Sequence, residues 1–288
     1  VAPIAAAAAA ARVQRLSAAE TASAIGLAAS MAGGLMAFQA DGAWSKWLHT
    51  GWAAQGGIAA AGLAARGFRG PHAALLHGEA PDLAALTRGL GSEWRGGAAH
   101  FKYYPCAHVI QPYIDAALAL RREHALAADD VAEARCAIAP WAVPIVCEPR
   151  AARIAPATEL DAIASLPFMV AHALAEGEVT LAALSAERRE RPGLRALAAR
   201  VVHEPDAAMG RGFDARLTIR TRSGATLTAA ADSAAPDAGR VAAKFIANAA
   251  PVLGTVRARQ AAERILALPA PDPAAIAALL RTNAPASP

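Results

Sequence analysis

Two short segments of the sequence bring lysine and histidine together with aromatic residues. The first, residues 41–54, reads DGAWSKWLHTGWAA and carries Lys46 and His49 among three tryptophans. A lysine and a histidine on a loop between buried helices form a positive, partly desolvated site. In the alternative interpretation, Lys46 is a solvated loop lysine and the tryptophans are core residues, and the spacing alone favours this second interpretation.

The second segment, residues 101–108, reads FKYYPCAH and leads into a predicted helix. Pro105 fixes the entry to that helix, whose first turn offers free backbone amides and the positive end of the helix dipole. Lys102 and His108 are therefore candidates to clamp a carboxylate and to move a proton. A capped helix with an incidental histidine explains the segment equally well.

Other sequence motifs for catalysis are absent. The chain contains no P-loop, no G-x-S-x-G, no H-E-x-x-H and no dinucleotide fingerprint, and Gly210-Arg211-Gly212 precedes a strand rather than a helix. The remaining histidines lack sequence partners and are expected to be structural or solvated: His72, His77, His100, His124, His172 and His203. Residues 187–191 mix arginine with glutamate and are expected to form a solvated surface.

Composition narrows the class of protein further. Hydrophobic residues make up 55% of the 288 residues but aromatic residues only 5%, which predicts a core of small side chains with close backbone contacts. A charged fraction of 18% argues against disorder, and a net charge of +4 suits small anions. Without a basic stripe or a basic amphipathic helix, neither nucleic-acid binding nor a membrane role is expected.

The cysteines and the amino-terminal residues indicate the cellular compartment that is expected for the protein. Cys106, Cys136 and Cys147 are scattered and form no C-x-x-C pair, so neither a zinc knuckle nor an iron–sulfur cluster is expected, and a cytoplasmic compartment fits best. Residues 1–11 and 21–40 are rich in Ala, Gly and Ser, which favours buried helices over membrane spans. The chain opens mid-pattern without a methionine, which predicts a truncated chain without a signal peptide.

The first hundred residues are predicted to form tightly packed helices. Ser17 and Glu20 form a capping-box pattern at the start of a helix expected to run to Phe38, and Asp41-Gly42 should break it. A second helix is expected from Gly51 to Arg66 and should stop at Gly67. Gly56, Gly57 and Gly62 would weaken this helix unless they allow another helix to approach closely.

The pattern changes to mixed helix and strand after Pro105. Leu217, Ile219 and Thr221 alternate with polar residues ahead of the turn signal Ser223-Gly224, as in a half-buried strand. The other predicted helices of this part lie at 109–122, 160–176 (ended by Gly177) and 274–280, and Val241, Phe245 and Val252 indicate one further helix face. Strands are predicted at 131–138, at 201–202 and within 215–231.

The two lysine–histidine segments, in this order and separation, resemble the signatures of the MmgE/PrpD family, D-G-x-[WS]-[ST]-K-x-x-H-x-G-W-A-A and K-x-Y-P-x-x-H. Residues 67–71, 114–117 and 165–167 agree as well, so that the resemblance covers nearly the whole chain. The family includes 2-methylcitrate dehydratase, cis-aconitate decarboxylase and iminodisuccinate epimerase.

The resemblance implies a mainly α fold in which an all-helical domain is joined to a smaller α+β lid domain. Residues 1–98 would be the C-terminal part of the helical domain, whose start is missing, and residues 99–265 the lid. Residues 266–288 would be a C-terminal helix and tail that return to the helical domain. A homodimer that uses no metal or organic cofactor is also implied.

The resemblance assigns site residues by position. Lys46, Lys102 and His108 match the catalytic lysines and histidine, and substrate binding falls to Lys46, His49, Lys102 and Ser165. The family's remaining catalytic histidines and an aspartate lie upstream of Val1. Phe168 stands where the family often has tyrosine, which indicates a different substrate.

The implied function is that of a cofactor-independent lyase acting on a small di- or tricarboxylate, by elimination of water as in 2-methylcitrate dehydratase. Decarboxylation of cis-aconitate and epimerisation of iminodisuccinate stay open, because the same basic residues serve all three reactions. A truncated, non-catalytic family member is the alternative from another class.

Overall fold

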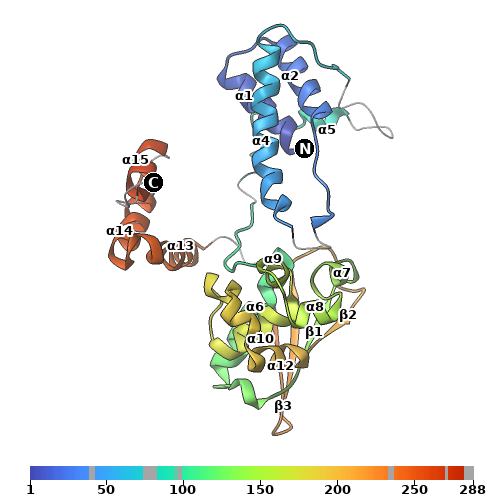
Figure 1. Ribbon diagram of the computed structural model, residues 1–288, viewed down its shortest axis with the longest axis vertical. Helices are drawn as coiled ribbons and strands as arrows, with labels where there is room; N and C mark the ends of the chain where they lie inside the picture. Colours follow the sequence, from blue (N-terminus) through green and yellow to red (C-terminus); the bar gives the residue numbers. More distant parts are fainter. Residues whose placement is uncertain are drawn as a thin grey trace. The chain divides into compact units, whose positions relative to one another are not determined.

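The computed structural model describes residues 1–38, 43–73, 83–94, 96, 99–232, 237–269 and 272–281 (Figure 1). The chain divides into two compact units, a helical unit (Val1–Gly97) and an α+β unit (Ala98–Pro288). The sequence analysis placed the corresponding boundary one residue later. The fold class, mainly helical with a second α+β unit, agrees with the expectation in outline.

The helical unit is built on three helices that pack against one another. They are α1 (Ala2–Val13), α2 (Ala18–Ser30) and α4 (Ser45–Ala64), and a short helix α5 (Leu83–Thr87) follows. Alanines form the core between the three helices, and Ala7, Ala24 and Ala60 are fully buried. Side chains this small leave little room between helices, so the backbones themselves must lie close together.

Gly57 marks the closest approach of α1 to α4. A Cβ atom at this position would lie 2.5 Å from the Cβ of Ala6 and 2.6 Å from the amide nitrogen of Ala7. The interpretation of a helix-contact glycine is therefore confirmed for Gly57. Gly56 differs, because a Cβ there would meet no atom within 4 Å.

The predicted helix boundaries in this unit are partly correct. The Ser17–Glu20 capping box is present, and Gly67 ends α4 with a φ of 83°. The helix expected to reach Phe38 instead ends at Ser30, because the Gly33-Gly34 pair follows and Gly34 has a φ of 129°, which no helix accommodates. The next helix begins at Ser45 rather than Gly51. Asp41 and Gly42 lie outside the described residues.

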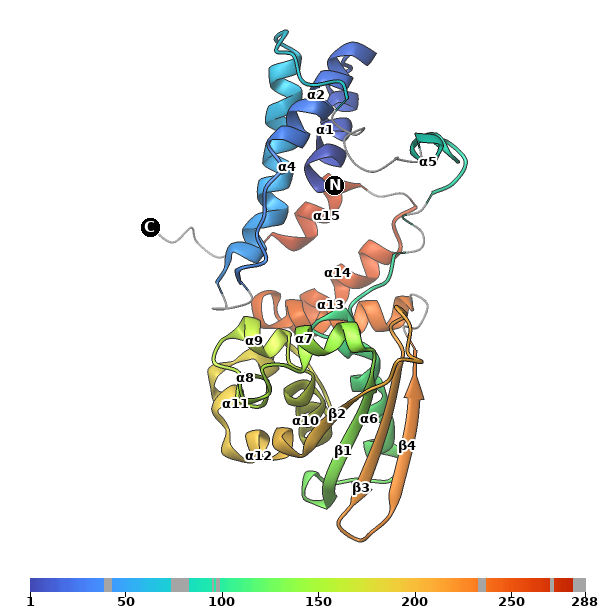
Figure 2. The same ribbon diagram turned by 90° about the vertical axis from the view of Figure 1, so that its right-hand side faces the viewer.

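A four-stranded mixed sheet organises the α+β unit (Figure 2). Its strands are β1 (Val131–Ile138), β2 (Val201–Pro205), β3 (Ala215–Thr221) and β4 (Thr226–Ala231), in the order β2-β1-β3-β4. β1 pairs with β2 in parallel and with β3 antiparallel, and β3 pairs antiparallel with β4. The predicted strands at these positions are confirmed.

Helices cover one face of this sheet. Cys136 of β1 lies opposite Leu217 of β3, and both are buried, whereas Arg135 and Arg216 on the other face are exposed. The packed helices are α6 (Gln111–Glu123), α10 (Leu166–Glu176) and α12 (Pro192–Arg200), which also contact one another in part. Short helices connect these elements: α7 (Val143–Val146), α8 (Arg150–Ile154), α9 (Glu159–Ile163) and α11 (Ala186–Glu190).

Proline positions correct two predicted helices. The helix expected over 160–176 is two helices, α9 and α10, and α10 starts afresh with Ser165 as its cap and Pro167 in its first turn. A proline inside one continuous helix would lose a hydrogen bond and clash with the preceding turn. In the same way α6 begins at Gln111 with Pro112 in its first turn, after a 3₁₀ turn over His108–Ile110.

Three further helices end the chain within the α+β unit: α13 (Ala238–Leu253), α14 (Thr255–Leu266) and α15 (Pro273–Leu280). α14 packs against both α13 and α15. The predicted helix at 274–280 is confirmed. Among the described residues, none of the helices combines the length and the apolar character needed to cross a bilayer.

The contrast between Gly57 and Gly56 yields a stability prediction. Gly57→Ala should destabilise the helical unit by about 1–3 kcal/mol, because its methyl group must push α1 away from α4. Gly56→Ala, the control, should stabilise it by up to about 1 kcal/mol, because alanine is the better helix former and meets no neighbour. Urea unfolding followed by circular dichroism measures both values, and equal effects would contradict the packing role of Gly57.

His172 of α10 is a polar group in the core of the α+β unit. It is 3% exposed, and its Nδ1 lies 3.1 Å from the carbonyl oxygen of Glu178. Its Nε2 is buried and has no hydrogen-bond partner among the described residues. Burial therefore lowers the pKa of His172 below its usual value of 6.5.

This burial predicts a loss of stability in acid. As the pH falls below about 6.5, the unfolded chain takes up the proton first, so the free energy of unfolding declines until the folded-state pKa is reached. The slope for one histidine is at most about 1.4 kcal/mol per pH unit. His172→Leu should reduce this slope, measured by urea unfolding between pH 7.5 and 5. An unchanged slope in the variant would show that His172 is not responsible.

Candidate functional site

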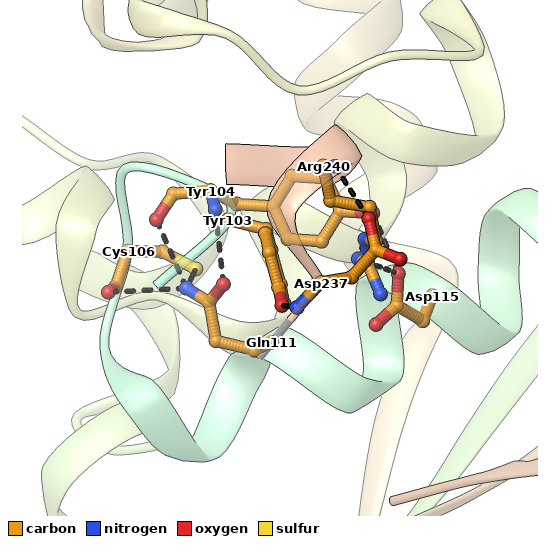
Figure 3. Close-up of polar contacts among 7 residues, drawn as sticks. All are labelled: Tyr103, Tyr104, Cys106, Gln111, Asp115, Asp237 and Arg240. Carbon is orange, nitrogen blue, oxygen red and sulfur yellow. Dashed lines mark hydrogen bonds and ion pairs between the residues drawn. The ribbon is translucent and has the colours of Figure 1, made fainter. Parts of the chain in front are cut away.

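The loop that carries the second lysine–histidine segment is closed by the side chain of Gln111, the first residue of α6 (Figure 3). Its Oε1 accepts a hydrogen bond from the Tyr104 amide at 2.9 Å, and its Nε2 donates to the Tyr104 carbonyl at 2.9 Å. The same Nε2 lies 3.1 Å from the sulfur of Cys106. Gln111 is 5% exposed, so these bonds form away from water and fix the course of the loop.

A second set of contacts joins this loop to α6 and α13 (Figure 3). The Tyr104 hydroxyl donates to Oδ1 of Asp115 at 2.6 Å, and Arg240 donates to the same oxygen at 2.8 Å. Burial, followed by the hydrogen bond to Asp115, raises the pKa of Tyr104 well above its usual value. Tyr104 therefore stays protonated and serves as a donor in this network.

The start of α13 is attached to the loop as well. The Arg240 guanidinium lies over the Tyr103 ring, 3.8 Å from its centroid, and the Asp237 amide donates to the Tyr103 hydroxyl at 3.0 Å. Lys244 donates to the carbonyl oxygen of Lys102 at 2.5 Å. The backbone at Lys102 is thus fixed by α13, whereas this contact does not involve the Lys102 side chain.

His108 begins the 3₁₀ turn that leads into α6 and is half-buried. Phe213 stacks against it with ring centroids 4.4 Å apart and a tilt of 33°, and His100 meets it edge-on at 5.8 Å. Burial lowers the pKa of His108, and the electrostatic interactions with Lys102 and His100 lower it further. His108 is therefore a neutral imidazole near pH 7, the form that accepts a proton.

A cavity of about 280 Å³ lies beside this loop. Its walls come from the loop (Tyr103, Tyr104), from the segment after α10 and from one side of α13 (Arg240, Lys244). His108 does not line it. The cavity is thus next to the loop but separate from the imidazole.

The helical unit holds the first lysine–histidine segment at the start of α4. The Phe38 ring lies near both side chains: its centroid is 5.8 Å from Nζ of Lys46 and 5.8 Å, edge-on, from the His49 ring. A cavity of about 430 Å³ is lined by residues 33–35, 37 and 38 and by the first half of α4, with His49 and Trp52 among its walls. Lys46 and His49 thus lie on one stretch of helix, not on the loop that the sequence analysis described.

The predicted site residues fall into three groups. Lys46 and His49 both lie near Phe38 in the helical unit, and Lys102 and His108 lie on the same loop of the α+β unit. Ser165 is fully buried; its hydroxyl donates to the carbonyl of Arg153 and accepts from the amide of Phe168. In the structure Ser165 therefore caps α10, and its hydroxyl is held by these two hydrogen bonds.

Phe168, where the resemblance led us to note a missing hydroxyl, is fully buried in α10. Its ring lies 6.3 Å from that of His172. The histidines set aside as structural or solvated include His100, which the fold brings against His108, and His172, which it buries. His77 lies outside the described residues.

Sequence reasoning missed several residues that shape the loop, above all Gln111, Arg240 and Phe213. Asp115 belongs to the stretch 114–117 that agreed with the family signature, so a signal for it existed, although no role was assigned. Arg240 and Phe213 lie more than a hundred residues from the loop they contact, and no local spacing connects them with it.

The cysteines are buried, and the described residues include no group suited to hold a metal ion. Cys106, Cys136 and Cys147 are buried free thiols, and burial raises the pKa of Cys106 to about 12. Within the described ranges, no three His, Cys, Asp or Glu side chains are grouped so that they could hold a metal ion. What the loop offers is a neutral imidazole beside an ammonium group, a pair suited to proton transfer next to a carboxylate.

Comparison with protein-family models matches both halves of the chain. Residues 1–90 match the MmgE/PrpD N-terminal domain, and residues 104–268 match the MmgE/PrpD C-terminal domain. A search of curated proteins finds no match. The two matches follow each other in the order that the sequence resemblance implied, and the second alone spans more than half of the chain. The chain therefore belongs to the MmgE/PrpD family.

Proposed function

We propose that this protein is a dehydratase that eliminates water from a small hydroxylated di- or tricarboxylate, most closely in the manner of 2-methylcitrate dehydratase. Family membership supports a dehydratase-type or related function. The observation that carries the proposal is the pairing of His108, a neutral imidazole near pH 7, with the positive charge of Lys102. Removal of a proton from the carbon next to a carboxylate needs a base to take up the proton and a positive charge to stabilise the carboxylate.

In the proposed reaction His108 is the general base. It takes the proton from the carbon next to a substrate carboxylate, the carbon–carbon double bond forms, and the hydroxyl group on the neighbouring carbon leaves as hydroxide. The proton held by His108 then passes to the hydroxide, which completes the water molecule and restores the neutral imidazole. A base works best when its pKa lies near or below the working pH, so that it is present in the neutral form. The lowered pKa of His108 meets this condition at pH 7.

Lys102 is proposed to bind the carboxylate next to the reacting carbon. Negative charge builds up on that carboxylate as the proton leaves, and a nearby ammonium group lowers the barrier by stabilising this charge. The roles of Lys46 in catalysis and of Lys46 and His49 in substrate binding rest on the family resemblance. So do the homodimer and the absence of a cofactor, whereas the cytoplasmic location rests on the cysteine usage.

The direct test is an assay of the purified full-length protein with 2-methylcitrate, cis-aconitate and iminodisuccinate in parallel. Elimination of water from 2-methylcitrate forms a conjugated double bond, which ultraviolet absorbance follows. Turnover of 2-methylcitrate supports the proposal. Turnover of cis-aconitate or iminodisuccinate alone replaces dehydration with decarboxylation or epimerisation, and no turnover of any of the three contradicts the proposed activity.

His108→Gln should lower kcat by about 10²- to 10⁴-fold, the usual contribution of a general base, and should leave KM nearly unchanged. Glutamine keeps the size and polarity of the side chain but cannot take up a proton. The control is His124→Gln at the exposed end of α6, which should keep wild-type kinetics. Full activity in His108→Gln would remove this residue from the mechanism.

Lys102→Met should raise KM and should shift the pH profile. The positive charge of Lys102 lowers the pKa of His108, so its removal raises that pKa, and the acid limb of kcat/KM moves to higher pH. The contact with Lys244 uses the backbone carbonyl of Lys102 and is retained in the variant. A pH profile that does not move would show that Lys102 does not act on the catalytic base.

A further inference from the structure

The orientation of the His108 ring needs an explanation beyond its place in the chain. A catalytic imidazole is commonly held by a hydrogen bond from its second nitrogen to a carboxylate or carbonyl. Among the described residues, the His108 side chain makes no hydrogen bond and no ion pair, and its contacts are with two rings, Phe213 and His100. These ring contacts are what restrict its rotation.

Phe213 is well suited to this task because its own position is fixed. It lies in the segment between β2 and β3 and packs against the core of the α+β unit. On the same segment, the Asp206 amide donates to the carbonyl of Ile138 at 2.8 Å, and the Trp141 indole donates to the carbonyl of Gly210 at 3.1 Å. Arg216 of β3 forms an ion pair with the Asp206 side chain.

The geometry of the three rings leaves the imidazole little freedom. The Phe213 ring lies over one face of His108 with a centroid distance of 4.4 Å, and His100 stands at 89° to the imidazole plane, 5.8 Å away. His100 also contacts Phe213 edge-on at 6.4 Å. Rotation of His108 about its Cβ–Cγ bond would turn the imidazole edge into the phenyl ring.

We infer that Phe213 is a positioning residue for His108: its flat ring holds the plane of the imidazole and keeps water from one face, while His100 closes a second side. The inference rests on the proposed function only in giving His108 the proton transfer; the positioning itself is a property of the α+β unit. Nothing in the sequence connects these residues, because Phe213 follows His108 by more than a hundred positions.

The groups with charge around His108 fit this assignment. Lys102 and His100 come from the loop before it, and Asp214 follows Phe213 in the sequence. The electrostatic interactions with Lys102 and His100 disfavour an imidazolium at His108, and so does its burial. An aromatic ring under a cation would have the opposite effect. Removal of the phenyl ring should therefore raise the pKa of His108 if burial dominates and lower it if a cation–π contact dominates, which makes the assignment testable.

The test compares Phe213→Leu, which keeps an apolar side chain but loses the flat ring, with Phe213→Tyr, which keeps the ring. A matched control is Phe245→Leu on α13, a half-buried phenylalanine in the same unit. For each variant, proton NMR follows the pH titration and ring-current shift of the His108 imidazole, assigned with His108→Gln. Steady-state kinetics then give kcat and KM for the substrate that the wild-type protein turns over.

Phe213→Leu should raise the pKa of His108 towards the ordinary histidine value, abolish the ring-current shift and lower kcat by about 10- to 100-fold with little change in KM. Phe213→Tyr and Phe245→Leu should behave like the wild-type protein. A pKa that is unchanged or lower in Phe213→Leu, or equal losses in the Leu and Tyr variants, would overturn the positioning role.

The NMR titration separates this inference from the proposed function. If the wild-type protein turns over none of the substrates but the His108 pKa and ring-current shift respond to Phe213→Leu as expected, positioning stands and the dehydratase proposal fails. If the enzyme is active but Phe213→Leu changes neither kcat nor the His108 resonances, the dehydratase proposal stands and the positioning role fails.

Discussion

The bonds between the side-chain amide of Gln111 and the backbone of Tyr104 are the constraint on which the candidate site depends. They satisfy both backbone groups of one residue in a part-buried loop that has no strand partner. Because Gln111 is also the first residue of α6, the loop and the helix start form one rigid piece. His108 lies within this closed loop, and the backbone of Lys102 precedes it and is bound by Lys244.

Around this loop, a carboxylate and an imidazole are held in different ways. Asp115 accepts hydrogen bonds from Tyr104 and Arg240, so its negative charge is paired with the guanidinium of Arg240. Among the described residues, no carboxylate forms a hydrogen bond or an ion pair with His108, whose ring is held by aromatic contacts instead. The difference has a chemical consequence: a carboxylate partner would raise the pKa of His108, whereas burial among rings keeps the imidazole neutral and able to accept a proton.

The helical unit follows another principle, in which small side chains allow backbones to meet. Gly57 touches α1 so closely that no Cβ atom fits, and alanines fill the core around it. Large apolar side chains of α4 are exposed instead, including Trp47, Trp52 and Ile58. The aromatic residues of the first signature segment are therefore not the core residues that the alternative interpretation of the sequence assumed.

The sequence alone determined the family, because two signature segments at the right separation are local patterns that need no fold to be recognised. It also determined the strands at 131–138 and 215–231 and the capping box at Ser17, since alternation and capping act within a few residues. It failed at helix boundaries near Gly33-Gly34 and Pro167, where backbone restrictions override the apolar pattern. Only the tertiary structure decided that Gln111 closes the loop, that Ser165 caps a helix and that Phe213 covers His108. Such contacts join residues far apart in the chain, and their energy comes from burial and packing that no local spacing encodes.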